Sequence, residues 1–283
     1  MEAKYETFLT LCKLMNYRET AELMHLTQPA VTRQIQSLEA EFQTKLFVYD
    51  HRRLYKTPEA ELLENYIIGM RHNYQALKEE LRRQRIKAIR VGATKTIGDY
   101  VLPDILTEYL REKNRNISLI IDNTETLLRA MREGKLDFAF VEGIFDKTTY
   151  ASKLLWEEDF IGICAKNHPL AGKAVDIKEL FNETLLVREA GSGTRDIFER
   201  ALKEQGFSLQ LFSRCSEISS FKLLTTLVSA GIGISFVYNA VIAAERNVGT
   251  FQVKGLQGTH EFNVVWLKGT KITEEGKALL DML

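Results

Sequence analysis

The segment from residue 28 to residue 41 constrains the fold of this chain more than any other. Four apolar side chains recur at spacings of four, three and four, which predicts a helix with one buried face: Val31, Ile35, Leu38 and Phe42. The opposite face carries Pro29, Arg33 and Gln36, with Thr32 beside them, and acidic residues come only at its far end. Such a face suits the major groove of DNA, where Arg reads guanine, Gln reads adenine and Thr meets the thymine methyl. An ordinary solvated helix face is the alternative.

The flanking residues favour the DNA interpretation. Apolar spacing predicts one helix around residues 8–15 and a second over residues 18–25, and Thr27 is a good N-cap for the third helix. After the third helix, residues 46–49 read as a strand, and a short basic hairpin through Arg52 and Arg53 follows. A basic hairpin behind a recognition helix is typical of a wing that contacts phosphate. We therefore expect a winged helix-turn-helix over residues 1–58. Its expected DNA-contacting residues are Arg18, Thr27, Gln28, Pro29, Thr32, Arg33, Gln36, Arg52 and Arg53.

The run from Thr20 to Ile35, followed by Leu38-Glu39, Leu46-Phe47 and Thr57-Pro58, resembles the LysR-type transcriptional regulators. The sequence departs from the family pattern at Thr20, where an alanine is usual, and at Ala60, where a glycine is common. Tyr49-Asp50 also replaces the usual Glu-Arg before the wing, so the wing contacts carry over less securely than those of the recognition helix. The resemblance implies a regulator that binds double-stranded DNA at an interrupted palindromic operator and responds to a small-molecule effector.

A long helix is predicted to connect this module to the rest of the chain, over residues 59–86. Apolar residues follow a heptad pattern along it: Leu63, Ile67, Met70, Tyr74, Leu77 and Leu81. Two helices can share such a seam, so we expect it to join two subunits into a homodimer, or to build a homotetramer. The alternative is a helix that packs on its own chain. A dimer would present two recognition helices to successive turns of the major groove.

Residues 87–283 alternate between strand and helix patterns, which predicts an open, mostly parallel sheet in each of two sets. The expected strands include residues 89–93, 117–121, 136–141, 184–187, 209–215 and 232–237, and the expected helices include residues 100–113, 126–132, 194–205 and 219–230. The resemblance implies a two-lobed domain similar to periplasmic binding proteins. Lobe I would hold about residues 87–158 and 259–283, and lobe II about residues 159–258. The fold class expected for the whole chain is α+β multidomain.

Three junctions between a strand and a helix in this domain are rich in hydroxyl groups. In open α/β sheets, ligands lie beyond the carboxyl ends of the strands, where helix N-termini favour anions. The effector-binding candidates are Thr94, Lys95, Thr96, Ser192, Gly193, Thr194, Arg195 and Ser219. Ordinary helix capping explains each junction taken singly, but their occurrence at equivalent points of two lobes predicts a cleft for a small anionic or polar molecule.

Composition adds little for or against DNA binding. The net charge is zero, with 15 basic and 12 acidic side chains among residues 1–90 against 23 and 26 in the remainder. No stretch has the ~20 consecutive apolar residues of a membrane span. The three cysteines, Cys12, Cys164 and Cys215, are far apart, which argues against a disulfide framework and for a cytoplasmic location.

Two other function classes have weaker support in the sequence. An enzyme is disfavoured because the five histidines show no metal-ligand spacing and Gly191-Ser192-Gly193 lacks the flanks of a nucleophile elbow. A redox-sensing regulator using Cys164 and Cys215 remains an alternative, although only Arg214 could lower a thiol pKa there. We expect no cofactor and no metal.

Overall fold

The computed structural model describes residues 2–51, 53–81, 88–245, 247–256 and 258–283. The chain divides into two compact units, one of Met1–Arg83 with Lys268–Lys271 and the other of Gln84–Leu267 with Ile272–Leu283. Each unit is described by itself.

The first unit begins with three helices, α1 (Ala3–Leu14), α2 (Tyr17–Leu23) and α3 (Gln28–Phe42). The Asn16 side chain caps α2, and the Thr27 hydroxyl accepts a hydrogen bond from the Ala30 amide at 3.3 Å to cap α3. Pro29 lies in the first turn of α3, where a missing N–H leaves no bond unmade. Helix α3 ends at Phe42, and its C-cap residue Gln43 adopts a left-handed conformation with φ 51°.

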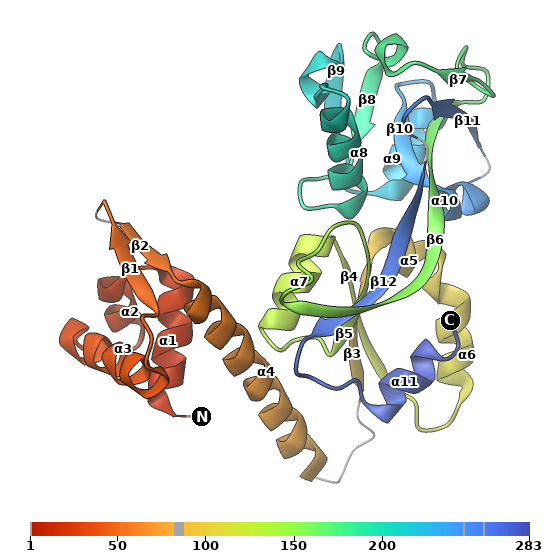
Figure 1. Ribbon diagram of the computed structural model, residues 1–283. Coiled ribbons are helices and arrows are strands. Elements are labelled where there is room, and N and C mark those ends of the chain that lie inside the picture. The colour runs from red at the N-terminus through yellow and green to blue at the C-terminus, as the bar shows by residue number, and fades with distance from the viewer. Residues whose placement is uncertain (1, 52, 82–87, 246, 257) are drawn as a thin grey trace. The chain divides into compact units, whose positions relative to one another are not determined.

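A two-stranded hairpin and one long helix complete this unit. Strands β1 (Phe47–Asp50) and β2 (Arg53–Lys56) pair antiparallel, and α4 (Pro58–Leu81) follows directly. The three short helices, the hairpin and the start of α4 enclose one apolar core, built from Phe8, Leu11, Cys12, Ala21, Val31, Ile35, Leu38, Leu46, Phe47, Ala60 and Ile67. The predicted winged helix-turn-helix is therefore confirmed, and so is the long helix as far as Leu81 (Figure 1). Residues 82–86 of its predicted range lie outside the described residues.

Lobe I of the second unit is built on the parallel strands β3 (Ile89–Thr94), β4 (Ile117–Asp122) and β5 (Phe138–Glu142), with β3 in the centre. Its helices are α5 (Lys95–Tyr100), α6 (Leu102–Arg111), α7 (Thr124–Arg132) and, from the end of the chain, α11 (Glu274–Leu280). Leu279 of α11 packs in the same core cluster as Tyr109 of α6.

Lobe II carries the short parallel pair β8 (Thr184–Val187) and β9 (Arg214–Glu217), and β10 (Ser235–Tyr238), which touches β8 through a parallel bridge between Leu185 and Ile234. The strands β7 (Ala174–Val175) and β11 (Val248–Val253) pair at its other side. Its helices are α8 (Gly193–Glu204), α9 (Phe221–Ser229) and α10 (Asn239–Ala244), with short 3-10 turns η1 (Ile177–Leu180) and η2 (Leu209–Leu211).

Two long strands run through both lobes, as Figure 1 shows: β6 (Tyr150–Ala165) and β12 (Thr259–Leu267). They pair antiparallel with each other, and the register shifts between Phe262 and Asn263, which face Trp156 and Leu154. This irregularity leaves Leu155 as an extra residue, and such a bulge bends a strand locally. The two-lobed α/β architecture predicted from the sequence is confirmed.

Three details differ from expectation. The stretch 209–215 is a 3-10 turn followed by β9, rather than one strand, because Leu211 is exposed and only residues from Arg214 onward pair with β8. The helix expected over residues 100–113 corresponds to α6, and a further short helix that was not expected, α5, precedes it and ends at Tyr100. The sheets are also less parallel than predicted, because β6 and β12 pair antiparallel with each other and with neighbouring strands.

Candidate functional site

The outer face of α3 is exposed and cationic. Gln28, Pro29, Arg33 and Gln36 are exposed, and Thr32 is half-buried with its hydroxyl donating to the Gln28 carbonyl at 3.0 Å. In the part of the chain that the structure describes, Arg33 has no carboxylate partner. A guanidinium that is free to move can make the bidentate contact to guanine that base readout needs.

The other predicted DNA-contacting residues differ in what their side chains contact. Thr27 is exposed and caps α3, and Arg53 is exposed at the start of β2. Arg18 forms an exposed ion pair with Glu22 of its own helix at 3.1 Å, which is too weak to prevent a phosphate contact. Arg52 lies outside the described residues.

The heptad seam of α4 divides into two groups in the structure. Ile67 is 1% exposed and Leu63 is partly buried, and both pack in the core of the winged helix. Met70, Tyr74 and Leu77 are exposed, and they continue a stripe that includes the strongly exposed Leu62 and Tyr66. The side chain of Leu81 lies outside the described residues. Since Leu63 and Ile67 fulfil a core function, the apolar surface available for pairing is shifted by about one residue from the predicted seam.

In the second unit, the predicted effector residues come together where the two lobes meet. A Cβ atom added to Gly193 at the start of α8 would lie 2.4 Å from the carbonyl oxygen of Glu142 in lobe I. The Glu125 amide also donates to the Gly191 carbonyl across the lobes at 3.3 Å. Only glycine at position 193 permits this approach, so the lobes touch directly beside Thr94, Thr96, Ser192 and Thr194.

Two of the helix starts do not use their hydroxyls for capping. Thr94 precedes α5 and Ser192 precedes α8, yet neither side chain accepts a hydrogen bond from its helix. Thr194 is 2% exposed, and its hydroxyl has no hydrogen-bond partner among the described residues. At the third junction, by contrast, Ser220 caps α9, and Ser219 contributes its backbone carbonyl rather than its hydroxyl.

The cations around these hydroxyls are all held by carboxylates or carbonyls. Arg188 is buried, binds Glu189 through two hydrogen bonds of 2.9 and 3.1 Å, and lies 4.0 Å from the centre of the Phe221 ring. Lys95 reaches from lobe I to the Glu189 carboxylate at 3.1 Å and to the Ser219 carbonyl at 2.9 Å. Burial opposes ionisation of Glu189, but these hydrogen bonds lower its pKa on balance. Lys95 and Glu189 thereby form a charged bridge between the lobes.

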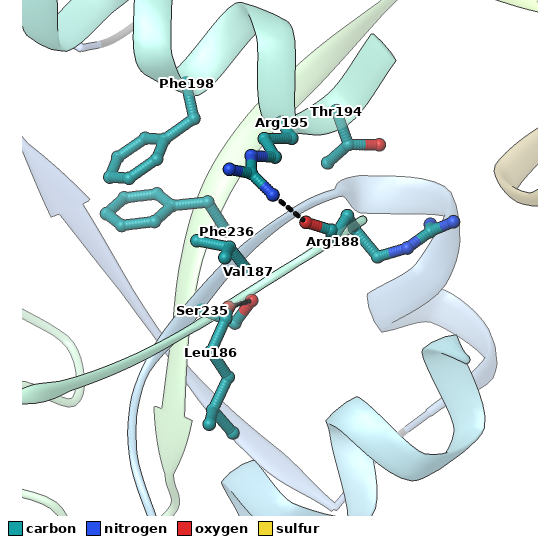
Figure 2. Close-up of a pocket in the computed structure, with 8 residues that line it drawn as sticks. All are labelled: Leu186, Val187, Arg188, Thr194, Arg195, Phe198, Ser235 and Phe236. Atoms are coloured by element: carbon teal, nitrogen blue, oxygen red, sulfur yellow. Dashed lines mark hydrogen bonds between the residues drawn. The ribbon is translucent and has the colours of Figure 1, made fainter. Parts of the chain in front are cut away.

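In Figure 2, the guanidinium groups of Arg195 and Arg188 lie on opposite sides of Thr194. Arg195 binds Glu199 and Glu217, and its Nη1 donates to the Arg188 carbonyl at 3.3 Å (Figure 2). The cavity in Figure 2 is lined by Leu186, Val187, Arg188, Thr194, Arg195, Phe198, Ser235 and Phe236. Its volume is about 10 Å³, which holds one water molecule.

A separate groove of about 470 Å³ is lined by Lys95 and Ser219, which also belong to the junction between the lobes, and it extends past Asp99 and Tyr100.

Sequence reasoning missed the group at the centre of this arrangement. Glu142 ends β5 and is 2% exposed, and its carboxylate accepts hydrogen bonds from both Thr94 and Thr96. Arg188 was also missed. A carboxylate inside an otherwise apolar strand, Phe138-Ala139-Phe140-Val141-Glu142, was the available signal, because buried strands rarely carry charge.

The cysteines lack the features of a redox pair. Cys164 is buried, and burial raises its pKa to about 11. Cys215 is exposed, and partial burial of its thiol raises its pKa as well. Reactive thiols have lowered pKa values, so neither cysteine is activated.

Within the described ranges, no helix is long and apolar enough to span a bilayer, and no cluster of three potential metal ligands occurs.

Comparison with known proteins agrees with both units. Residues 3–61 match the "Bacterial regulatory helix-turn-helix protein, lysR family", and residues 82–283 match the "LysR substrate binding domain". The transcriptional regulator CysL of Bacillus subtilis is 29% identical over 243 residues, covering 84% of this chain and 80% of its own. The uncharacterised regulator MJ0300 of Methanocaldococcus jannaschii is 27% identical over 254 residues, covering 88% and 86%.

Solved structures share the fold. The regulatory domain of CcmR from Synechocystis PCC6803, in complex with 2-PG, has a TM-score of 0.62 at 21% identity and covers 69% of this chain and 94% of its own. An OxyR mutant from Corynebacterium glutamicum has a TM-score of 0.60 at 21% identity and covers 99% of this chain and 89% of its own. With a LysR helix-turn-helix and a LysR substrate-binding domain that together account for nearly the whole sequence, this chain belongs to the LysR family and is a DNA-binding transcriptional regulator with an effector-binding domain.

Proposed function

We propose that this regulator senses a small molecule carrying an oxyanion group, bound between lobes I and II at the hydroxyls of Thr94, Thr96, Ser192 and Thr194. Binding there changes the contact between the lobes and, through the domain, the placement of the DNA-binding units. The observation that carries the proposal is the buried, unpartnered hydroxyl of Thr194 beside two helix starts whose hydroxyls do not cap. A buried polar atom without a partner costs free energy unless a ligand or water satisfies it.

The charges nearby support an anion. Arg188 and Lys95 lie at the same junction between the lobes, and both form an ion pair with the Glu189 carboxylate. Helix α8 begins at Gly193, so its free backbone N–H groups and helix dipole favour negative charge at this point. The CcmR domain, which has this fold, was solved with 2-PG.

The contacts between the lobes imply movement on binding. Gly193 of lobe II lies against the Glu142 carbonyl of lobe I, and the Lys95–Glu189 bridge joins the lobes beside it. A ligand that enters between Thr96 and Thr194 has to separate the lobes at both points. The bulge at Leu155 and the uninterrupted strands β6 and β12 supply the connection about which they would turn.

On the DNA side, Arg33, Gln36 and Thr32 are proposed to read bases, with Gln28 and Pro29 approaching the groove at the start of α3. Thr27, Arg18 and Arg53 are proposed to contact phosphates. The exposed stripe of α4, from Leu62 through Tyr66, Met70 and Tyr74 to Leu77, is proposed to pair two subunits, so that two such faces meet two half-sites.

The effector proposal is tested by thermal unfolding of the full chain with a panel of phosphate, sulfate and short mono- and dicarboxylates. A ligand that binds only the folded state raises the unfolding temperature. The stabilising anion should lose its effect with Thr96→Val and Thr194→Val, which keep side-chain volume but remove the hydroxyl. Thr107→Val, on the exposed side of α6, is the matched control and should respond like the parent protein. Equal shifts in all four proteins would place the anion elsewhere.

A further inference from the structure

The carboxylate of Glu142 occupies the position that a bound oxyanion would take. Both of its oxygens accept hydrogen bonds from threonine hydroxyls of lobe I, one from Thr94 and the other from Thr96 at 3.2 Å. Its backbone carbonyl accepts from the Thr124 hydroxyl at 3.1 Å and lies against Gly193 of lobe II. The hydroxyls that the sequence assigns to a ligand are therefore held by the protein itself.

Within the described residues, no cation neutralises this carboxylate directly. Among the ion pairs of the described residues, within 4.0 Å, none includes Glu142, although it is 2% exposed. Arg188 acts on it through its field only, because the guanidinium is bound to Glu189. Lys95, between Thr94 and Thr96, points to Glu189 and Ser219 instead.

The groups that contact Glu142 directly are neutral. The hydroxyl of Tyr238, at the end of β10, is buried without a partner in the described chain, and burial raises its pKa well above the ordinary value. Thr124 and Gly193 lie against its backbone carbonyl and carry no charge. The charged side chains that follow them, Glu125 of α7 and Arg195 and Asp196 of α8, form no ion pair with Glu142 in the described chain, and neither does Asp99 of α5. A buried carboxyl in such surroundings favours its neutral form, and burial does raise the pKa of Glu142 above the usual value.

We propose that Glu142 is an internal competitor for the oxyanion site, which yields the hydroxyls of Thr94 and Thr96 to a bound oxyanion only by taking up a proton. The inference rests on the proposed oxyanion effector, and it states that Glu142 takes up one proton when the effector binds. The proton comes from solvent and joins one carboxylate oxygen of Glu142. The neutral acid can then donate a hydrogen bond to the ligand instead of repelling it.

This linkage has a definite sign. Above the pKa of Glu142, the site must be protonated before the anion binds, so the Kd for the anion rises about tenfold for each pH unit. Below that pKa, the Kd is constant. In the absence of ligand, the folded state holds the proton more tightly than the unfolded chain, so stability from the neutral form is lost as the pH rises through the folded pKa.

The test is calorimetric titration of the full chain with sodium sulfate, whose own charge does not change between pH 5.5 and pH 8.5. Titrations in buffers of different ionisation enthalpy count the protons taken up. The expected result above the pKa is about one proton per sulfate in the parent protein. In Glu142→Gln, which keeps a neutral hydrogen-bonding group, we expect none and a Kd that no longer depends on pH.

The control is Glu108→Gln, a carboxyl exposed on α6, which should behave like the parent protein. Sulfate binding by the parent protein without proton uptake would overturn the role of Glu142 and leave the proposed effector site standing. Loss of sulfate binding in Glu142→Gln at every pH would overturn it too, because the charged carboxylate would then be required. Absence of sulfate binding in both proteins at every pH would refute the oxyanion site and this inference together. The proton count on the parent protein needs no variant to fold.

Discussion

Arg33 on α3 and Arg188 in lobe II both lie where an anion is expected, but the protein treats them differently. Arg33 is exposed and has no carboxylate partner in the described chain, whereas Arg188 is buried, bound twice by Glu189 and stacked on Phe221. Lys95 and Arg195 resemble Arg188 in this respect, since each has a carboxylate within hydrogen-bond distance.

The contrast reflects what each cation meets. An exposed guanidinium remains hydrated while it waits for DNA, so it needs no partner. A guanidinium buried between two lobes has lost its water, and a buried charge without a counter-ion is costly. The junction between the lobes therefore satisfies its own charges, and the effector proposed above would have to compete with groups such as Glu142 and Glu189. The apolar stripe on α4 resembles Arg33, because its side chains are also exposed within a single chain.

The largest effect is expected at that stripe. Tyr66→Asp combined with Leu77→Asp places charge on side chains that are 75% and 49% exposed, so the fold of the subunit is preserved while pairing is lost. Sedimentation velocity should show monomers. Affinity for a selected two-half-site operator should fall ~10²–10⁴-fold, as expected when two linked contacts become one.

Gln75→Asp, at an exposed polar position of the same helix, is the control and should remain paired. Asp at Leu63 or Ile67 is less informative, because both side chains belong to the winged-helix core. A dimer that survives the double substitution would show that α4 does not supply the interface.

Arg33→Ala should cost ~1–3 kcal/mol of binding to the selected operator, with little loss on random DNA, because an unpaired guanidinium that reads a base carries specificity. Fluorescence anisotropy with both DNAs at fixed salt measures the difference. Lys13→Ala, in the last turn of α1, should leave the ratio unchanged. Equal losses on the two DNAs would mean that Arg33 contacts phosphate alone.

Lys95→Met should have a smaller effect, because the Lys95–Glu189 bridge is partly exposed to solvent. Removing it should lower the free energy of unfolding of the effector domain by less than ~1 kcal/mol, and the difference should shrink at high salt. Urea unfolding of the full chain at two salt concentrations measures this. Lys277→Met, which breaks an exposed pair with Glu274, is the matched control. A loss several times larger would mean that the bridge is effectively buried.

Cys215→Ser should have no effect on DNA binding before or after peroxide treatment, because the pKa of this thiol is raised rather than lowered. Gel-shift titration with and without peroxide measures the response, and Cys164→Ser gives the companion result. Peroxide sensitivity that disappears in Cys215→Ser would revive the redox alternative and break the interpretation of the cleft as the sensing site.

Local spacing predicted every helix of the DNA-binding unit, since Val31, Ile35 and Leu38 must face a core at helical period whatever surrounds them. The same reasoning found the hydroxyl-rich starts of α5 and α8, because helix N-termini have characteristic residues. Periodicity cannot say which partner covers an apolar face, however. Only tertiary structure shows that Ile67 packs on its own chain while Tyr66 remains exposed.

The same limit applies to the cleft. Glu142 lies 46 and 48 positions from the threonines that bind it, and 46 from Arg188, so no local pattern connects these residues. The sequence by itself determined that a helix-turn-helix is followed by a two-lobed α/β domain, because both follow from short-range patterning of apolar residues. The tertiary structure alone decided that the predicted ligand hydroxyls already bind a protein carboxylate, because this contact depends on the pairing of β3 with β5, two strands of lobe I that are far apart in the sequence.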